Sequence, residues 1–182
     1  MLERGWEPVL SGRDAGKLAA LAQAFPGLEQ RPASVDDPAA LDRALAGTVA
    51  VIHCAGPFTD TGAPLIEAAL RAGIHYLDTA AEQQPVIAAF ERYAGQARDA
   101  GIAVVPAMAF YGGLADLLAT AAMGDWTQAD EVRIAVALDS WHPTEGTRLT
   151  GKRNTARRLL VDQGALTFVA DPMPTGRWVF AE

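Results

Sequence analysis

Four consecutive residues near the start of the chain, Ser11-Gly12-Arg13-Asp14, could bind a phosphate group. They follow a short apolar run, so we expect them at the carboxyl end of a β-strand. In a dinucleotide-binding sheet an acidic residue at this place binds the ribose of NAD, whereas an arginine holds the 2′-phosphate of NADP. Arg13 suits the second role because guanidinium groups bind phosphate through two parallel hydrogen bonds. Ser11 would add a hydroxyl, and Lys17 lies one helical turn further on. A solvated Arg13 beside a helix-capping Asp14 explains the same residues equally well.

A second candidate is a loop of small residues that follows the apolar run 49–53 and reads Cys54-Ala55-Gly56-Pro57-Phe58. Small side chains allow a ligand to approach the backbone closely, and Phe58 could pack on an adenine or nicotinamide ring. The alternative is a plain turn between a strand and a helix. Cys54 is more typical of a small buried residue than of a nucleophile. Neighbouring strand residues point to opposite faces, which argues against a catalytic pair of Cys54 and His53.

Polar residues also follow the next short apolar run. Asp78, Thr79 and Glu82 would face the ligand edge of the sheet and could bind substrate or ribose hydroxyls. We favour the alternative in which Asp78 or Thr79 caps the helix that begins near Glu82. His75 is expected to be a packed or surface residue.

A third loop carries the pair Gly112-Gly113 just before a predicted helix. The pair could offer free backbone N–H groups to a ligand, or could act as a hinge into the region that follows. Asp116 is a candidate for an inward polar role.

Several catalytic patterns are missing from the sequence. It contains no G-x-G-x-x-G, P-loop or G-x-S-x-G motif. The three histidines lack metal-ligand spacing, and no tyrosine has a lysine four residues later. With only two lysines, a Schiff-base mechanism is improbable.

Strands and helices alternate through the first part of the chain, which predicts an α/β fold with a parallel sheet and helices on both faces. Helices are expected at 14–25, 38–45, 62–72 and 83–100, and strands at 6–10, 28–33, 49–53, 74–77 and 102–106. Asp37 should cap the second helix, with Pro38 at its first position. The expected domain is therefore a Rossmann-like sheet over residues 1–124.

The pattern changes after residue 125, where residues 125–182 predict the start of an α+β substrate or dimerisation domain. We expect strands at 131–138, 166–170 and 177–180, and a basic helix at 147–163.

The bulk composition narrows the class of protein. Half of the 182 residues are hydrophobic, and the formal net charge is −7, which argues against a nucleic-acid partner. A single cysteine forbids an intrachain disulfide and fits a reducing compartment. Because no apolar stretch reaches 18 residues, no transmembrane segment is expected, and a cytoplasmic location is predicted.

Three segments together resemble the saccharopine dehydrogenase-like family, and more narrowly its trans-acting enoyl reductase or saccharopine reductase-like branch. They read "EPVLSGRDAGKLAALA", "VIHCAGPFTDTGAPLIEAALRAGIHYLD" and "ARDAGIAVVPAMAFYGGLADLLA", and "PTEGTRLTGKRNTARRLL" is similar to a helix of the family's substrate domain. The resemblance implies a Rossmann domain and NADP-linked oxidoreduction, with NAD as the other possible cofactor. It implies that Ser11, Gly12 and Arg13 contact the adenosine 2′-phosphate and that residues 55–58 lie along the cofactor. Lys17, Cys54 and Thr79 complete the predicted cofactor site, and no catalytic residue is assigned.

The sequence departs from this family at both ends. The family begins with a strand and a G-x-x-G-x-x-G turn, whereas this chain begins at the end of the helix that follows them. We therefore expect a truncated or split oxidoreductase with a small-molecule substrate. A homodimer would cover open sheet edges. The alternative is a degenerate, non-catalytic Rossmann-like module with an interaction or regulatory role.

Overall fold

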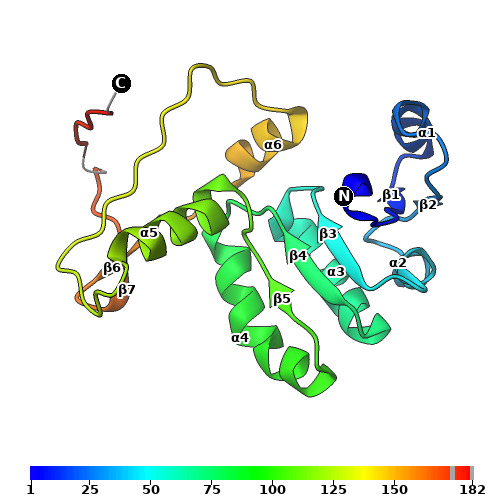
Figure 1. The fold of residues 1–182 in the computed structure, drawn as a ribbon, viewed down its shortest axis with the longest axis horizontal. Coiled ribbons are helices and arrows are strands. Elements are labelled where there is room, and N and C mark those ends of the chain that lie inside the picture. Colours follow the sequence, from blue (N-terminus) through cyan, green and yellow to red (C-terminus); the bar gives the residue numbers. More distant parts are fainter. Residues whose placement is uncertain (173–174, 181–182) are drawn as a thin grey trace.

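The computed structural model describes residues 1–172 and 175–180. The first part contains a 3₁₀ turn at Leu2–Arg4, strands β1 (Leu10–Gly12), β2 (Gln30–Pro32), β3 (Ala50–His53), β4 (His75–Asp78) and β5 (Val104–Val105), and helices α1 (Ala15–Ala24), α2 (Pro38–Leu45), α3 (Phe58–Ala72) and α4 (Gln83–Ala100) (Figure 1). A π-helical turn at Phe110–Leu114 leads into α5 (Ala115–Met123). The last elements are α6 (Glu145–Arg153), β6 (Leu159–Asp162) and β7 (Ala165–Phe168).

The predicted parallel α/β architecture is confirmed. Strands β1 and β2 form one parallel pair, and β3, β4 and β5 form a parallel sheet with β4 in the middle. Among the described residues, no strand pairs with the outer edge of β1 or of β3. In the register of β3 and β4, Val51 lies beside Tyr76 and His53 beside Asp78. Alternate strand residues share a face, so these four side chains lie on one face of the sheet.

Local sequence signals set most helix ends. The carboxylates of Asp14 and Asp37 accept hydrogen bonds from the N–H groups of Lys17 and Ala40, which confirms both predicted N-caps. Gly73 and Gly101 end α3 and α4 in the left-handed conformation, at φ 66° and 67°, which costs glycine little. The start of α3 was predicted at Gly62, but the helix begins at Phe58.

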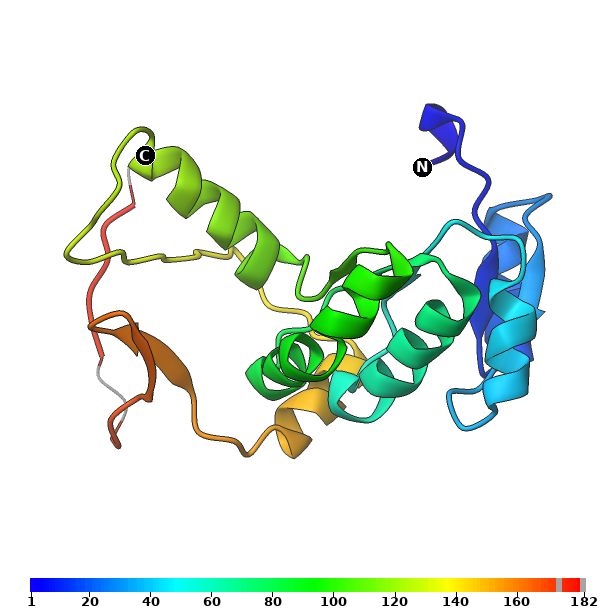
Figure 2. The same cartoon turned by 90° about the horizontal axis from the view of Figure 1, so that it is seen from below.

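The buried core lies between helices α2, α3 and α4 and one face of the sheet. Leu41, Ile66 and Tyr93 come from the three helices and meet Tyr76 of β4, which is fully buried. Ala68 and Ala69 are also fully buried, so α3 approaches its neighbours closely. Figure 2 shows α3 and α4 side by side beneath the connecting loops.

Three predictions for residues 125–182 are wrong. Segment 131–138 is not a strand, because no described strand pairs with it, and neither is 177–180. The basic helix ends at Arg153, where the predicted helix ran on to residue 163. Leu159–Asp162 instead pairs antiparallel with β7. The two residues between these strands, Gln163 and Gly164, have φ values of 49° and 78°, as a two-residue hairpin turn requires.

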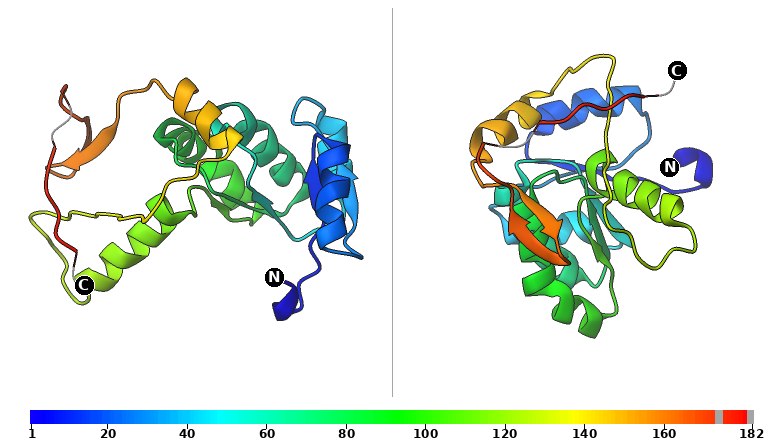
Figure 3. Two further views of the ribbon diagram at one scale, coloured as in Figure 1. Left: turned by 90° about the horizontal axis from the view of Figure 1, so that it is seen from above. Right: turned by 90° about the vertical axis from the view of Figure 1, so that its left-hand side faces the viewer.

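The hairpin and the segment before α6 extend away from the parallel sheets, as the left view of Figure 3 shows. In the described part of the chain, no helix has the length and apolar character needed to cross a membrane.

Candidate functional site

The residues predicted to bind the 2′-phosphate lie together at the end of β1. Gly12 ends the strand, Arg13 follows it, and Lys17 lies in the first turn of α1. The hydroxyl of Ser11 donates to the backbone oxygen of Arg31 at 2.8 Å, so this group is already used between β1 and β2. Both Arg13 and Lys17 are exposed, and among the described residues neither side chain forms a hydrogen bond or an ion pair. Arg13 therefore offers a free cation beside the end of a strand.

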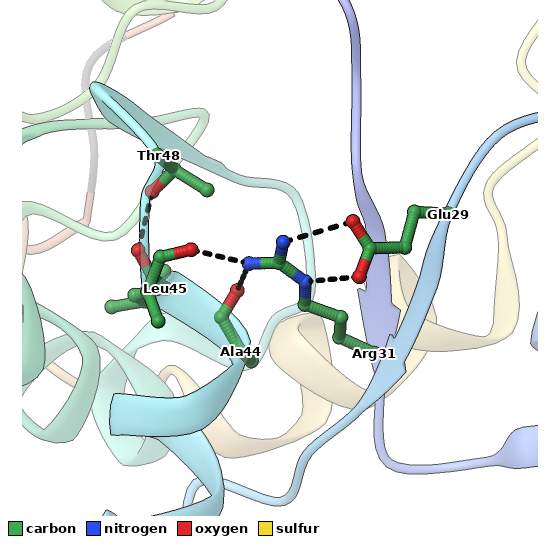
Figure 4. Close-up of polar contacts among 6 residues, drawn as sticks. Glu29, Arg31, Ala44, Leu45 and Thr48 are labelled. Atoms are coloured by element: carbon green, nitrogen blue, oxygen red, sulfur yellow. Dashed lines mark hydrogen bonds and ion pairs between the residues drawn. The ribbon is translucent and has the colours of Figure 1, made fainter.

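The other arginine near this strand end, Arg31 of β2, is fully engaged (Figure 4). Its guanidinium donates two hydrogen bonds to the carboxylate of Glu29, at 2.8 and 2.9 Å. It also donates to the backbone oxygens of Ala44 and Ala46, which lie at the end of α2, where a cation is favoured. The hydrogen bond to Arg31 lowers the pKa of the Glu29 carboxyl. Arg31 therefore holds α2 against β2.

The loop after β3 forms a second group, which the structure does not join to the first by any hydrogen bond or ion pair among described residues. Cys54 is exposed, contrary to the expectation that it is buried. The backbone oxygen of Ala55 accepts a hydrogen bond from the hydroxyl of Thr61 at 2.9 Å. Thr79 lies next to this loop, because its N–H donates to the backbone oxygen of His53. Gly56 lies close to other parts of the chain, since an added Cβ would lie 3.3 Å from the Phe58 ring.

Phe58 is buried at the start of α3. Its ring packs edge-on against the ring of His53, with 4.8 Å between the centroids. This contact packs the Phe58 ring against the last residue of β3, so it holds the two ends of the loop together. The predicted contact of Phe58 with an adenine or nicotinamide ring stays a prediction.

Three buried polar side chains meet beneath the loop and were not grouped together by the sequence analysis. The hydroxyl of Tyr76 donates to Asp78 Oδ2 at 2.8 Å and lies 3.0 Å from His53 Nδ1. His53 Nε2 lies 3.1 Å from the backbone oxygen of Ala55. Strand periodicity could have found the group, because His53 and Asp78 each end a strand and Tyr76 lies two residues before Asp78.

Asp78 does not cap α4, so that prediction is wrong. Its Oδ1 accepts hydrogen bonds from the N–H groups of Ala80 and Ala107, at 2.9 and 2.7 Å. Its backbone oxygen accepts from the N–H of Met108 at 2.7 Å. The residue therefore joins the ends of β4 and β5. The cap position of α4 is Glu82, without a side-chain capping bond in that helix.

The Glu82 carboxylate instead accepts a hydrogen bond at the N-terminus of the preceding helix, α3. Its Oε1 accepts a hydrogen bond from the N–H of Phe58, the first residue of α3, and its Oε2 accepts from Ala81. The side chain is buried. A carboxylate at a helix N-terminus is stabilised by the helix dipole. The positive end of α3 is therefore already occupied by a carboxylate of the chain itself.

One of the two glycines after β5 also uses its N–H within the chain. The N–H of Gly113 donates to the backbone oxygen of Ala107 at 2.9 Å, which closes the turn before α5. The predicted free N–H is therefore used within the chain at that position. Asp116 is exposed on α5, so its predicted inward role is wrong.

A shallow apolar hollow of about 230 Å³ lies between α4 and β5, lined by residues such as Phe90, Ala94 and Ile102. None of the predicted site residues lines it. The chemistry available to the chain therefore lies at the ends of β1, β3 and β4. No group of three or more His, Cys, Asp or Glu side chains in the described residues could hold a metal ion.

Comparison with protein families gives one match. Residues 3–105 match the family described as the saccharopine dehydrogenase NADP binding domain. No curated protein matches the chain.

Solved structures with a similar fold include apo saccharopine dehydrogenase (L-Glu forming) from Saccharomyces cerevisiae, at 22% identity and a TM-score of 0.55. That match covers 63% of this chain and 24% of the yeast chain. Triphenylmethane reductase from Citrobacter sp., complexed with NADP(H), matches at 23% identity and a TM-score of 0.39, over 51% of this chain and 36% of the reductase. An NADPH-dependent quinone oxidoreductase from Escherichia coli matches at 27% identity and a TM-score of 0.37, over 52% and 34%. The chain thus spans between a quarter and about a third of these proteins.

Proposed function

The chain belongs to the saccharopine dehydrogenase NADP-binding domain family, and from this premise we propose that it is the nucleotide-binding part of an NADP-dependent oxidoreductase. NADP is the cofactor that the family model indicates. The proposed substrate is a small molecule with a C=C, C=O or C=N group. Bound NADPH would supply the hydride, while the protein supplies orientation and electrostatics.

One observation carries this proposal: the Arg13 side chain has no partner in the described chain, whereas the nearby Arg31 side chain is fully hydrogen-bonded. Both arginines lie near the carboxyl ends of β1 and β2, where a dinucleotide-binding sheet places the adenosine ribose. Arg31 is held by Glu29 and the end of α2, whereas the Arg13 side chain is exposed and makes no hydrogen bond among the described residues. Arg13, supported by Lys17, fits a 2′-phosphate. We assign the remaining cofactor contacts to the loop 54–58 and Thr79.

We expect the substitution Arg13→Ala to weaken NADPH binding on the order of tenfold to a hundredfold, because a charge-assisted pair with phosphate is lost. Binding of NADH, which lacks the 2′-phosphate, should hardly change. Fluorescence titration with both nucleotides measures the two affinities. The control is Arg43→Ala, which removes another exposed positive charge, on α2. Equal NADPH affinity in the Arg13 variant and the wild type would contradict the assigned role.

The alternative function, a non-catalytic module, is favoured by the position of Glu82. This carboxylate occupies the first N–H of α3, where an incoming phosphate would otherwise be stabilised. A ligand that binds the folded state raises the melting temperature. No shift with either nucleotide would therefore favour the non-catalytic role.

We further propose that the protein is a homodimer formed through residues 126–172 and 175–180. The chain exposes 13,380 Å², about 5,000 Å² more than a compact monomer of its 19.2 kDa mass would expose. Obligate dimer interfaces bury about 2,000–5,000 Å² in total. The exposed apolar residues of this region alternate along one segment and continue on the hairpin: Val132, Ile134, Val136, Leu138, Val161, Leu166 and Phe168.

Sedimentation should give a mass of two chains for the wild type and of one chain for Ile134→Asp, because the substitution places a charge among the apolar residues. Ala137→Asp adds the same charge at an alternate position of the same segment and should leave the dimer intact. A wild-type mass of 19.2 kDa at micromolar concentration would contradict the dimer.

A further inference from the structure

His53, Tyr76 and Asp78 form a continuous chain of hydrogen bonds that ends at the loop after β3. The contacts run from Asp78 Oδ2 to the Tyr76 hydroxyl, then to His53 Nδ1, and from His53 Nε2 to the backbone oxygen of Ala55. The three side chains are 4%, 0% and 4% exposed. No buried side-chain nitrogen or oxygen of the described residues lacks a partner. Every contact in this chain of bonds therefore needs a hydrogen atom.

The three contacts need one more proton than the three side chains carry in their ordinary ionisation states. The chain contains three contacts and so requires three protons. A neutral imidazole brings one, a phenol brings one, and an ionised carboxylate brings none. The third proton is present either when both ring nitrogens of His53 are protonated or when Asp78 carries a proton. In both arrangements the three groups together have no net charge.

The charges around this group support the same count. The ionisable groups facing the His53 ring are Tyr76 and Asp78 from β4 and Glu82 from the turn before α4. Among the described residues, no cationic side chain forms an ion pair with Asp78 or Glu82. Two ionised carboxylates beside a neutral ring would bury two unbalanced charges, which is costly. One shared proton leaves only Glu82 charged, and the N-terminus of α3 stabilises it.

We propose that His53, Tyr76 and Asp78 take up one additional proton when the protein folds, and that this neutral network positions the loop 54–58. The role of the loop in nucleotide binding rests on the function proposed above, but the proton count does not. His53 and Tyr76 are positioning residues here, because neither has a place at the reacting atoms.

Burial determines where the shared proton resides. Desolvation lowers the pKa of His53 and raises the pKa of Tyr76. Both changes favour a neutral ring with hydrogen on Nε2 and an intact phenol. The shared proton then lies between the Asp78 carboxylate and the Tyr76 hydroxyl, whose oxygens are 2.8 Å apart.

This arrangement predicts how stability depends on pH. Well above a pH of about 6.5 the unfolded chain holds almost no proton on His53 or Asp78, whereas the folded network holds one. The unfolded state then binds fewer protons, so stability falls as the pH rises. One proton taken up on folding makes the unfolding equilibrium constant rise about tenfold per pH unit. The rise ends where the folded network itself loses the proton.

Asp78→Asn is the matched variant. An amide oxygen at this position can accept from Ala80 and Ala107, and the amide N–H₂ can donate to the Tyr76 oxygen. Tyr76 then donates to His53 Nδ1, and His53 Nε2 donates to Ala55. All contacts are satisfied without an additional proton. The variant should fold, and its folded network should bind no proton above a pH of about 6.5.

The experiment compares chemical denaturation of the wild type and Asp78→Asn from pH 5 to 8.5. The ratio of their unfolding constants should increase with pH, on the order of tenfold per unit while the network keeps its proton. Other titrating groups are common to both proteins and cancel. A ratio that stays constant over this range would overturn the proposal.

Nitrogen-15 and carbon-13 NMR of the wild type, without nucleotide, gives a second measurement at pH 7. We expect a neutral His53 with hydrogen on Nε2 and a protonated Asp78, and a doubly protonated His53 would equally support the count. Neutral His53 beside ionised Asp78 would overturn it. The positioning role predicts that NADPH affinity depends on pH differently in the two proteins. Failure to bind NADPH at all would count against the proposed function and leave both proton measurements standing.

Discussion

Asp78→Ala is expected to destabilise the fold by about 4 kcal/mol, a large part of the stability of an ordinary domain. The Asp78 carboxyl contacts three donors, the Tyr76 hydroxyl and the N–H groups of Ala80 and Ala107. Alanine leaves the two N–H groups without this partner and the Tyr76 hydroxyl with His53 Nδ1 alone, and each unsatisfied buried group costs about 1–3 kcal/mol. Part of this cost is recovered if water enters the space.

Urea denaturation followed by circular dichroism measures this change. Asp99→Ala is the control, because it removes an exposed carboxylate near the end of α4. A negative charge near a helix C-terminus is slightly unfavourable, so its removal should change stability by less than about 1 kcal/mol. If Asp78→Ala unfolds at the same urea concentration as this control, the three hydrogen bonds contribute nothing to stability.

The contacts of Asp78 differ from its predicted role, and the difference shows which contacts a sequence pattern can predict. Sequence spacing suggested that Asp78 caps α4, since an aspartate four residues before Glu82 is near a helix start. The structure instead connects Asp78 to Ala107, which is 29 residues away. Caps at Asp14 and Asp37 were predictable because their partners lie three residues along the chain. Asp78 was not, because one of its partners, Ala107, comes from the end of the neighbouring strand.

The same reason explains the errors after residue 125. Segment 131–138 has the alternation of a strand, but a strand also needs a partner, and none of the described residues provides one. The basic run after Arg153 has helical composition, yet pairing of Leu159–Asp162 with β7 prevails. Tertiary pairing overrides local propensity in both cases. The parallel order of β3, β4 and β5 was predictable, because short connections through helices allow few other arrangements.

The sequence predicted which residue types form the candidate site. It did not predict which of these side chains are free to bind a ligand. Arg13 was chosen for its guanidinium and its place after an apolar run. Arg31 lies within the next predicted strand, 28–33, and the sequence did not show which of the two side chains is engaged. Only the contacts of Arg31 with Glu29 and the end of α2 reveal that it is engaged.

Gly112→Ala is expected to cost about 3 kcal/mol, because the new methyl group would overlap the backbone oxygen of Ala107 and lie 3.0 Å from its Cβ. The overlap involves backbone, which cannot move aside without breaking the hydrogen bond from Gly113 to the same oxygen. Ala107 already has a positive φ of 61°, so this turn has little freedom to adjust. The turn should therefore open, and the N–H of Ala107 should lose its contact with Asp78.

Gly95→Ala is the matched control for this substitution. Gly95 is exposed within α4, and an added Cβ there meets no atom within 4 Å. Alanine in a helix interior is favoured over glycine by about 1 kcal/mol, so this variant should be slightly more stable than the wild type. Hydrogen exchange at Ala107, Met108 and Gly113 should accelerate in Gly112→Ala alone. Unchanged exchange at these three positions would mean that the turn accommodates a side chain, and that Asp78 does not depend on its shape.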